Sequence, residues 1–479
     1  MSDRPEESKN QQSIETQPAE ATTNNWDGPH DQRNPRNWSR LRKWTNMLLL
    51  GGLVFLDALG SSITAAAIPA LIDEFGVKHA NRVVITLVTS VYNLGIAFGP
   101  TIMAPLSELL GRWWLYQASN VVFISCNIAC ARSGTLGMLV PFRLLAGCAS
   151  AAPVTIGAGT ITDLYREKER GVPTAIWAGA AIIGPIIGPV AGALISYGAT
   201  WRWTFWLLVI IGGFLLILCL FFLDETNPAA ILKLGGLRGR LCSGGAGQDE
   251  KAIDTLCKSL YRPIRLLFRE PLVSVVSIWS ALSVAHLFIL FTSVEEVLID
   301  KYDFSLPVSS LAFVAMGIGA IAGQILYTAL SDRTVRLHDK GGDLRAEHRL
   351  PWMMLGSLAL PIGLFWFGWS SEAHTHWMSL FSALFVCGLG LAIVLIAPLS
   401  YLIDVYEQHA ASAITGSLIL RALSGAFFPL IGPPLFHDLG YGWGCSVLAF
   451  MALVFVPVPV FLYKYGESFR KVSVDRVTQ

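Results

Sequence analysis

Apolar segments alternate with short polar ones from one end of the chain to the other. Each apolar run is about 18–25 residues long, the length that a helix needs to cross the hydrocarbon core of a membrane. The pattern predicts twelve spanning helices, at residues 44–68, 83–104, 113–131, 138–163, 172–196, 201–223, 271–294, 308–330, 351–370, 377–401, 410–434 and 442–463. A polar interval over residues 224–270 divides them into two sets of six. The expected fold is therefore an all-α membrane protein with two six-helix bundles.

The composition indicates the same class of protein. Of the 479 residues, 53% are hydrophobic and 14% are charged, whereas a soluble chain of this length needs far more polar surface. The glycine-rich stretch "LGGLRGRLCSGGAGQDEK" lacks the G-x-x-x-x-G-K-[ST] pattern of a phosphate-binding loop, and no segment can hold a soluble nucleotide-binding domain. ATP is therefore not expected as the energy source, and this stretch is interpreted as a flexible linker.

Lysine and arginine predict the orientation in the membrane. Most of them fall in segments on the same side as the N-terminus, and the other side holds Lys78, Arg82, Arg132, Arg202 and Lys301. Cytoplasmic loops are the ones enriched in these residues, so both termini are expected in the cytoplasm. Residues 1–43 have no apolar core of a signal peptide, so no cleavable one is expected. The expected organisation is a disordered cytoplasmic tail (1–43), two bundles (44–223 and 271–463), a cytoplasmic linker (224–270) and a cytoplasmic C-terminal tail (464–479).

A short motif occurs twice at a constant offset of 224 residues. Its pattern is G-x3-G-x6-L-S-[DE]-x3-R, and each copy lies where an even-numbered span reaches the cytoplasm. The repeat indicates two bundles of like orientation, as in large secondary transporters. The matched pairs are Gly95 and Gly319, Gly99 and Gly323, Leu106 and Leu330, Ser107 and Ser331, Glu108 and Asp332, and Arg112 and Arg336.

The motif predicts a gate at the cytoplasmic side. Glycines four residues apart allow close helix packing, and an acid and an arginine four apart can pair with each other or with the opposite half. An exposed pair is worth only ~0.2–1 kcal/mol, which suits a contact that must open. The alternative is that Ser107 and Glu108 merely cap the next helix. The gate residues are Gly99, Ser107, Glu108, Gly111, Arg112, Asp332 and Arg336.

At these residues the chain resembles the major facilitator superfamily, and within it the fungal twelve-span drug:proton antiporters. The resemblance implies a transporter that exports drugs, toxins or metabolites in exchange for protons. It departs from the family at Ala146, Ile156 and Ser400, where Gln, Asn and Asn are usual, and this affects the expected substrate. The stretches that carry it are Trp26–Ser39, Ala104–Arg112, Arg143–Gly171, Trp201–Trp206, Asp224–Leu232, Tyr401–Tyr406 and Leu439–Leu448.

Three charged residues lie where lipid or protein interior is expected. Asp57 is near the middle of the first span, where a carboxylate costs ~2.5–3.5 kcal/mol unless it is paired, protonated or facing water. Arg143 is its candidate partner, and the resemblance implies that this arginine takes part in proton transfer. Glu295 is a further candidate for proton coupling. Each residue has an alternative interpretation. Asp57 can be a structural acid bonded to neighbouring hydroxyls, Arg143 a packing cation, and Glu295 part of a solvated helix end.

The fifth predicted span contains Gly184, Pro185, Gly188 and Pro189 in "GAAIIGPIIGPVAGALI". Proline removes a backbone donor and bends a helix, and glycine permits close packing. These four residues are predicted to form a pivot at the interface between the halves, and the resemblance associates the pattern with exporters. Simple tight packing is the alternative.

Four side chains are candidates for the wall of a central substrate cavity. These are Tyr92, Trp177, His286 and Phe288. Aromatic residues also fill membrane helices generally, and His286 can equally be a core histidine. The eight cysteines show no CxxC spacing, so neither a metal site nor a disulfide framework is expected.

The sequence therefore predicts a proton-coupled secondary transporter that exports a small organic compound by alternating access. It is expected to need no cofactor beyond the proton gradient, to bind no nucleic acid, to be a monomer and to reside in the plasma membrane. Two alternatives remain open, a proton-symporting uptake permease and a membrane-embedded enzyme or sensor.

Overall fold

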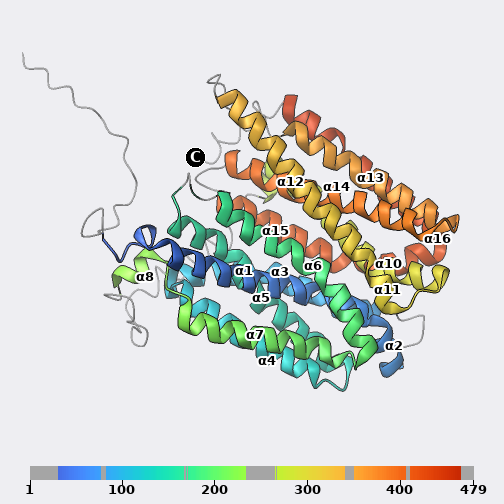
Figure 1. Cartoon of the computed structure of the whole chain (residues 1–479), viewed down its shortest axis with the longest axis horizontal. Helices are drawn as coiled ribbons and strands as arrows, with labels where there is room; N and C mark the ends of the chain where they lie inside the picture. The colour runs from blue at the N-terminus through green and yellow to red at the C-terminus, as the bar shows by residue number, and fades with distance from the viewer. Residues whose placement is uncertain are drawn as a thin grey trace, which may run out of the picture.

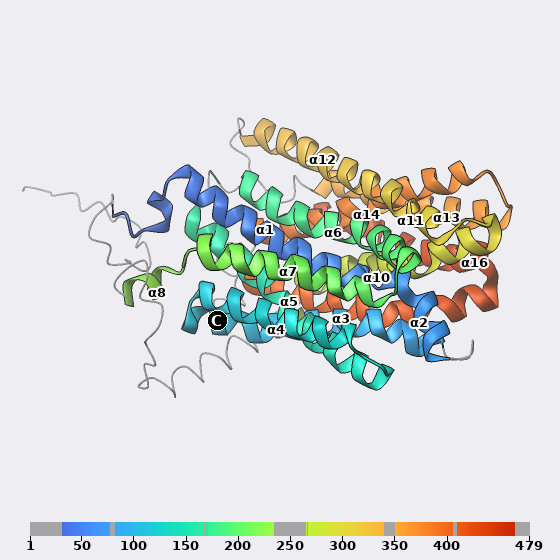
Figure 2. The same ribbon diagram turned by 60° about the horizontal axis from the view of Figure 1, so that its bottom comes forward.

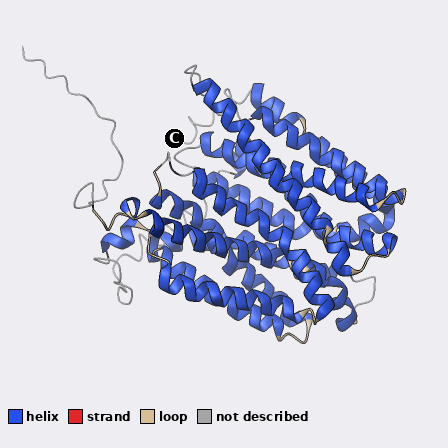
Figure 3. Ribbon diagram, in the orientation of Figure 1, coloured by secondary structure: helices blue, strands red, loops and turns tan. Residues whose placement is uncertain are grey.

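The structure is a computed structural model that describes residues 31–76, 82–166, 169, 171–233, 265, 267–339, 350–405 and 410–464. All regular secondary structure in these ranges is helical (Figure 3). The α-helices are α1 (Arg40–Ser62), α2 (Ile68–Phe75), α3 (Arg82–Leu110), α4 (Arg112–Ala131), α5 (Leu136–Leu164), α6 (Gly171–Gly198), α7 (Arg202–Phe222), α8 (Pro228–Lys233), α10 (Pro271–Tyr302), α11 (Leu306–Ser310), α12 (Ala312–Asp339), α13 (Leu350–Glu372), α14 (Trp377–Val405), α15 (Ala410–Phe427) and α16 (Gly432–Leu453). Short 3-10 helices are η1 (Pro35–Asn37), η2 (Ala65–Ala67) and η6 (Phe428–Leu430).

Each predicted span falls on a helix. Ten of the described helical segments are long and apolar enough to cross a membrane. Of the other two predicted spans, 113–131 is α4, which carries Gln117, Asn120 and Asn127 and is therefore less apolar. The span at 410–434 corresponds to the shorter apolar helix Ile414–Leu430, since the chain turns at η6. The prediction of a multi-pass helical membrane protein is confirmed.

The two halves repeat the same helix packing. In the first half α3 packs on α5, α1 on α6 and α4 on α7. In the second half, α12 packs on α14, α10 on α15 and α13 on α16. Figures 1 and 2 show these two sets of helices as neighbouring bundles, coloured blue to green and yellow to red. This correspondence confirms the two pseudo-symmetric six-helix bundles.

The bundles contact each other mainly where α3 packs on α15 and where α6 packs on α12 and α11. Asn93 Nδ2 donates to the carbonyl oxygen of Gly425 at 3.4 Å. A Cβ at Gly317 in α12 would collide with the side chain of Ile186 in α6. We call the end of the molecule that contains α2 and α11 the α2 end and the opposite end the Arg112 end. Gly425 and Gly317 both lie within six residues of the α2-end termini of their helices.

The segment before the first span is more structured than expected. Residues 1–30 of the predicted tail lie outside the described residues. The rest of the predicted tail, up to residue 43, contains η1 and the start of α1. Asn34 and Ser39 cap these two helices by accepting bonds from the backbone N–H groups of Arg36 and Arg42. Trp38 is buried. The expectation of disorder does not apply to residues 35–43, because capping and tryptophan burial fix them to the bundle.

Candidate functional site

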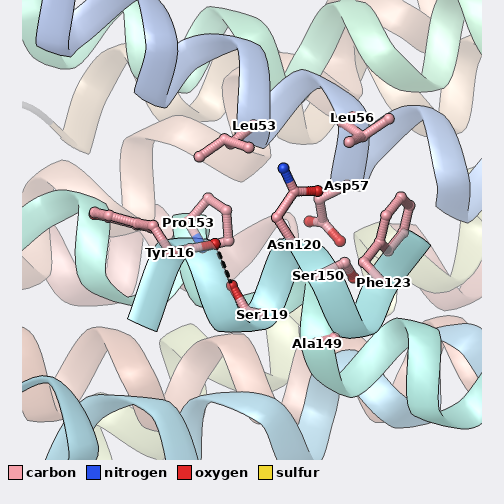
Figure 4. Close-up of a pocket in the computed structure, with 10 residues that line it drawn as sticks. All are labelled: Leu53, Leu56, Asp57, Tyr116, Ser119, Asn120, Phe123, Ala149, Ser150 and Pro153. Carbon is pink, nitrogen blue, oxygen red and sulfur yellow. Dashed lines mark hydrogen bonds between the residues drawn. The ribbon is translucent and has the colours of Figure 1, made fainter. Parts of the chain in front are cut away.

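A small pocket between α1, α4 and α5 contains the carboxylate of Asp57 (Figure 4). Asp57 is 6% exposed, and its neighbours in the pocket are mostly apolar or hydroxyl-bearing. Its position follows from the sequence, because the first span places residue 57 well inside the helix. The lining residues are Leu53, Leu56, Asp57, Tyr116, Ser119, Asn120, Phe123, Ala149, Ser150 and Pro153.

Hydroxyl groups, and no cation, contact this carboxylate among the described residues. The hydroxyl of Tyr92 lies 3.3 Å from Asp57 Oδ1, and Ser150 also interacts with the carboxylate. The neighbouring Ser61 and Ser62 donate instead to carbonyl oxygens of their own helix. The alternative in which adjacent serines of the first span satisfy Asp57 is therefore not what the structure shows. The partners come from α3 and α5.

Arg143 is completely buried beside this pocket. Its Nη2 donates to Gly60 O at 3.1 Å and to Thr64 Oγ1 at 2.9 Å, and its Nε donates to Val88 O at 3.2 Å. These three acceptors lie on α1, on the turn after it and on α3. Arg143 Nη1 has no hydrogen-bond partner among the described residues. The arginine thus joins three helices of the first half by binding their oxygen atoms.

The direct pairing of Asp57 with Arg143 that the sequence suggested is wrong. Within the described ranges, no salt bridge joins Asp57 and Arg143. Tyr92 lies between them, since its hydroxyl contacts Asp57 and its ring lies 4.4 Å from the guanidinium carbon of Arg143. A carboxylate held only by hydroxyls can accept a proton without breaking an ion pair. Tyr92 links the acid and the cation, and its predicted place on the cavity wall stays a prediction.

The second polar cluster lies at the Arg112 end. Arg112 forms an ion pair with Asp163 of α5 at 2.8 Å, and its Nη1 donates to Ile156 O at 3.0 Å. Both side chains of the pair are largely buried. Sequence reasoning missed Asp163, which comes close to Arg112 only through the packing of α4 against α5. The predicted gate arginine is therefore fixed to a helix of its own half.

The start of α4 is capped by an acid from beyond α7. Glu225 accepts from the backbone N–H groups of Arg112 and Trp113 at 3.0 and 2.9 Å. Gly111 permits this approach because its φ is +85° and its ψ is 168°, a region that only glycine adopts readily. The Ser107 hydroxyl donates to Ala104 O within α3, so Ser107 is not the cap of α4. Electrostatically, a carboxylate at a helix N-terminus is favourable.

The segment that follows α7 is attached to the bundle, although the sequence assigned it to a flexible linker. Asp224 Oδ2 pairs with Arg42 Nε at 2.7 Å. Asn227 Nδ2 donates to Ser107 O at 3.2 Å. The stretch Asp224–Leu232 carries part of the family resemblance. That resemblance is the sequence signal that this segment has a structural role in the bundle. The linker at 234–264 lies outside the described residues.

Other gate residues are only partly described. The structure does not describe the side chains of Glu108, Asp332 and Arg336. The pairing expected for them from the sequence therefore stays a prediction. Gly99 lies against Cys148 and Ala151 of α5, and a Cβ there would collide with both. Gly99 thus packs α3 onto α5, as its motif predicts for glycines at this spacing.

The glycines of the predicted pivot face α1, not the second half. A Cβ at Gly184 would collide with Ala58, and one at Gly188 with the hydroxyl of Ser62. Pro185 and Pro189 lie inside α6, which stays helical across both. The predicted place at the interface between halves is therefore wrong for the glycines, because this face of α6 binds α1 of its own half. Ile186 of this stretch packs against Gly317 of α12.

The remaining candidates lie in different surroundings. Trp177 is half-buried between α6 and α5, and its Nε1 donates to Pro153 O at 3.4 Å. Phe288 is buried against Gly425, between α10 and α15. His286 is also buried, and its Nε2 lies 2.9 Å from Leu448 O of α16. His286 is thus a core residue of the second half, since its ring lies between two helices of that half.

Glu295 is a buried acid in α10, near the α2 end. Its side chain is 6% exposed within the protein. Its Oε1 has no hydrogen-bond partner among the described residues. The structure therefore keeps Glu295 as a candidate for proton binding, in the second half. No group of three or more potential metal ligands occurs among the described residues.

Two repeated bundles of membrane-length helices, each with a buried ionisable group, are typical of a membrane transporter. The profile of the Major Facilitator Superfamily matches residues 50–429. The chain belongs to this superfamily.

Its curated relatives are fungal transporters. It is 39% identical over 461 residues to the MFS transporter cpaT of Aspergillus oryzae, covering 95% of this chain and 92% of that one. It is 38% identical over 454 residues to the efflux pump radE of Floropilus chiversii, covering 93% and 84%. Among solved structures, the xylose transporter XylE of E. coli superposes with a TM-score of 0.64 at 15% identity, covering 89% of this chain and 98% of that one. The last likeness shows the fold.

Proposed function

We propose that this transporter exports a small organic compound in exchange for protons by alternating access. The observation that carries the proposal is the buried Asp57 carboxylate, which has hydroxyl partners and is linked through Tyr92 to the buried cation Arg143. A relative with 38% identity is named an efflux pump, which supports the direction of transport.

The proposed cycle uses the protonation state of Asp57 as its switch. A negative Asp57 is attracted by Arg143 across the Tyr92 ring, and protonation removes that attraction. Arg143 binds oxygen atoms on α1 and α3, so a change in its position is transmitted to both helices. α3 contacts the second half through Asn93. Proton binding is thereby coupled to the contact between the two bundles.

We further propose that the Arg112 end faces the cytoplasm and that both termini lie there. The clustering of arginine and lysine at this side supports the assignment. The protein is proposed to work as a monomer in the plasma membrane, with the proton gradient as its only energy source. One proton that moves inward across 100 mV releases ~2.3 kcal/mol, enough for a roughly fiftyfold concentration ratio of the exported compound.

The proposal is tested by efflux measurements in cells that express the chain and lack their own pumps. Cells are loaded with fluorescent organic compounds of different charge, such as fluorescein and rhodamine 6G. Export predicts lower accumulation than in cells without the protein, and a protonophore should raise it. Asp57→Asn should abolish this difference while surface expression is unchanged. Asp73→Asn, at an exposed acid in α2, is the matched control and should export normally.

Three other outcomes of this experiment would each overturn a different part of the proposal. Higher accumulation that a protonophore lowers would identify an uptake symporter and overturn the direction of transport. Normal export by Asp57→Asn would overturn the role of this acid. Export that is insensitive to the protonophore would overturn proton coupling.

A further inference from the structure

Arg421 is a cation deep within a membrane-spanning helix of the second half. It lies eleven residues after Ala410 and six before Phe427, the ends of α15. Unlike Arg143, it has no hydrogen bond and no ion pair with any residue that the structure describes. Arginine stays charged at any physiological pH, so its guanidinium requires water or an anion at this depth.

The side of α15 that carries Arg421 faces protein. Its helical neighbours Ser417, Ser424 and Gly425 are all buried, whereas Arg421 itself is half-buried. This side contacts both halves of the molecule. Gly425 lies against Phe288 of α10, and its carbonyl accepts a bond from Asn93 of α3. Arg421, one turn from Gly425, therefore lies at the boundary between the bundles.

Two hydroxyl groups that have no partner among the described residues lie within one helical turn of this level. α10 and α15 run in the same direction, and Gly425 is level with Val284. One turn earlier on each helix, Arg421 is level with Ser280, and Ser417 follows one turn below. Both serines are fully buried, and their Oγ atoms have no hydrogen-bond partner among the described residues. Register on the two packed helices thus places a permanent cation within about one helical turn of two buried hydroxyl groups.

We propose that Arg421, Ser417 and Ser280 form a subsite for the acidic group of the transported compound. The inference rests on the proposed export function, because it names the chemical class of its substrate as an organic acid. A carboxylate accepts two parallel N–H bonds from guanidinium, and serine hydroxyls can bind its remaining lone pairs. A neutral or cationic compound would leave the guanidinium without a counter-charge.

The test is a binding measurement that needs no proton gradient. The purified full chain in nanodiscs of phosphatidylcholine is titrated with 2-naphthoate and with 2-naphthamide, which has the same shape and no charge. The apparent Kd is obtained from the dependence of the Tm on ligand concentration. Naphthoate should raise the Tm and naphthamide should not. Arg421→Gln should weaken naphthoate binding at least about tenfold, and Arg421→Lys should restore part of it.

Controls separate this subsite from other effects. Arg333→Gln, at an exposed arginine in α12, should leave naphthoate binding unchanged. Equal responses to both compounds, including none to either, or naphthoate binding that survives Arg421→Gln, would overturn the proposal. Phosphatidylglycerol nanodiscs give one more outcome that would overturn the proposal. If the anionic lipid raises the Tm in an Arg421-dependent way and naphthoate then has no further effect, the site binds a lipid headgroup. A failure of proton-driven export with acid binding intact would contradict only the proposed function.

Discussion

The hydroxyl of Tyr92 lies 3.3 Å from Oδ1 of Asp57, and it connects α3 to α1 although η2 and α2 separate these two helices in the sequence. Tyr92 is fully buried, so this contact is shielded from solvent. A hydrogen bond between buried groups at this place lets α3 respond to the charge on α1.

Replacing Tyr92 by Phe tests this contact. The ring remains beneath Arg143, but Asp57 loses a hydrogen-bond donor worth about 0.5–1.5 kcal/mol. We expect proton-driven export to slow about three- to tenfold, with the Tm of the protein little changed. Export rates at several external pH values measure the effect. Tyr401→Phe, at a fully buried tyrosine of the second half, is the control, and equal slowing there would argue against a specific role for Tyr92.

Breaking the Arg112–Asp163 pair should destabilise the first half. Asp163→Ala leaves a largely buried guanidinium without its counter-charge, which costs about 1–3 kcal/mol. The Tm in detergent should therefore fall by several degrees. Replacing both residues, in Arg112→Met with Asp163→Ala, should recover part of the loss. If the double variant is as unstable as the sum of the single variants, the two residues are not coupled.

Glu225 should act as a helix cap. Glu225→Ala leaves the N–H groups of Arg112 and Trp113 without their acceptor, and the expected loss of stability is about 0.5–2 kcal/mol. Glu225→Gln retains an acceptor and should cost less. Gly111→Ala should destabilise more than either, since its backbone conformation suits only glycine and a Cβ would lie 2.6 Å from Glu225 Oε2. Thermal unfolding of the three variants gives the order, and a neutral Gly111→Ala would contradict this geometry.

Two glycines of α6 should respond oppositely to the same substitution. Gly188→Ala places a methyl group against Ser62 and should cost about 1–3 kcal/mol through overpacking of α1 on α6. A Cβ at Gly179 meets no atom within 4 Å, so Gly179→Ala should be neutral or stabilising by up to about 1 kcal/mol. The Tm values of both variants are compared with the wild type. Equal shifts would show that packing against α1 does not matter.

Hydropathy and spacing were enough to predict the fold. Span positions depend on runs of apolar residues, and the duplicated motif required only a constant offset. Buried charges such as Asp57 and Arg143 were visible because they interrupt apolar runs.

The contacts of these residues were not predictable in the same way. The pivot glycines were assigned to the wrong face, because the face that a helix apolar on all sides turns to a given neighbour depends on the packing of the whole bundle. Asp163 and Glu225 lie at span ends, where acids are common and pairing depends on tertiary packing. The core position of His286 could not be decided from the sequence, because its partner, Leu448 O, is a backbone group of a distant helix.

The close contact of α6 with α1 also brings the proton-binding candidate near the other bundle. Ala58, which touches Gly184, directly follows Asp57, and Ile186, two residues beyond Gly184, touches Gly317. α6 therefore has α1, the helix that carries Asp57, on one side and α12 of the second bundle on the other. The two contacts come from positions two residues apart, so α6 is a direct physical link between the helix of the ionisable group and the other bundle.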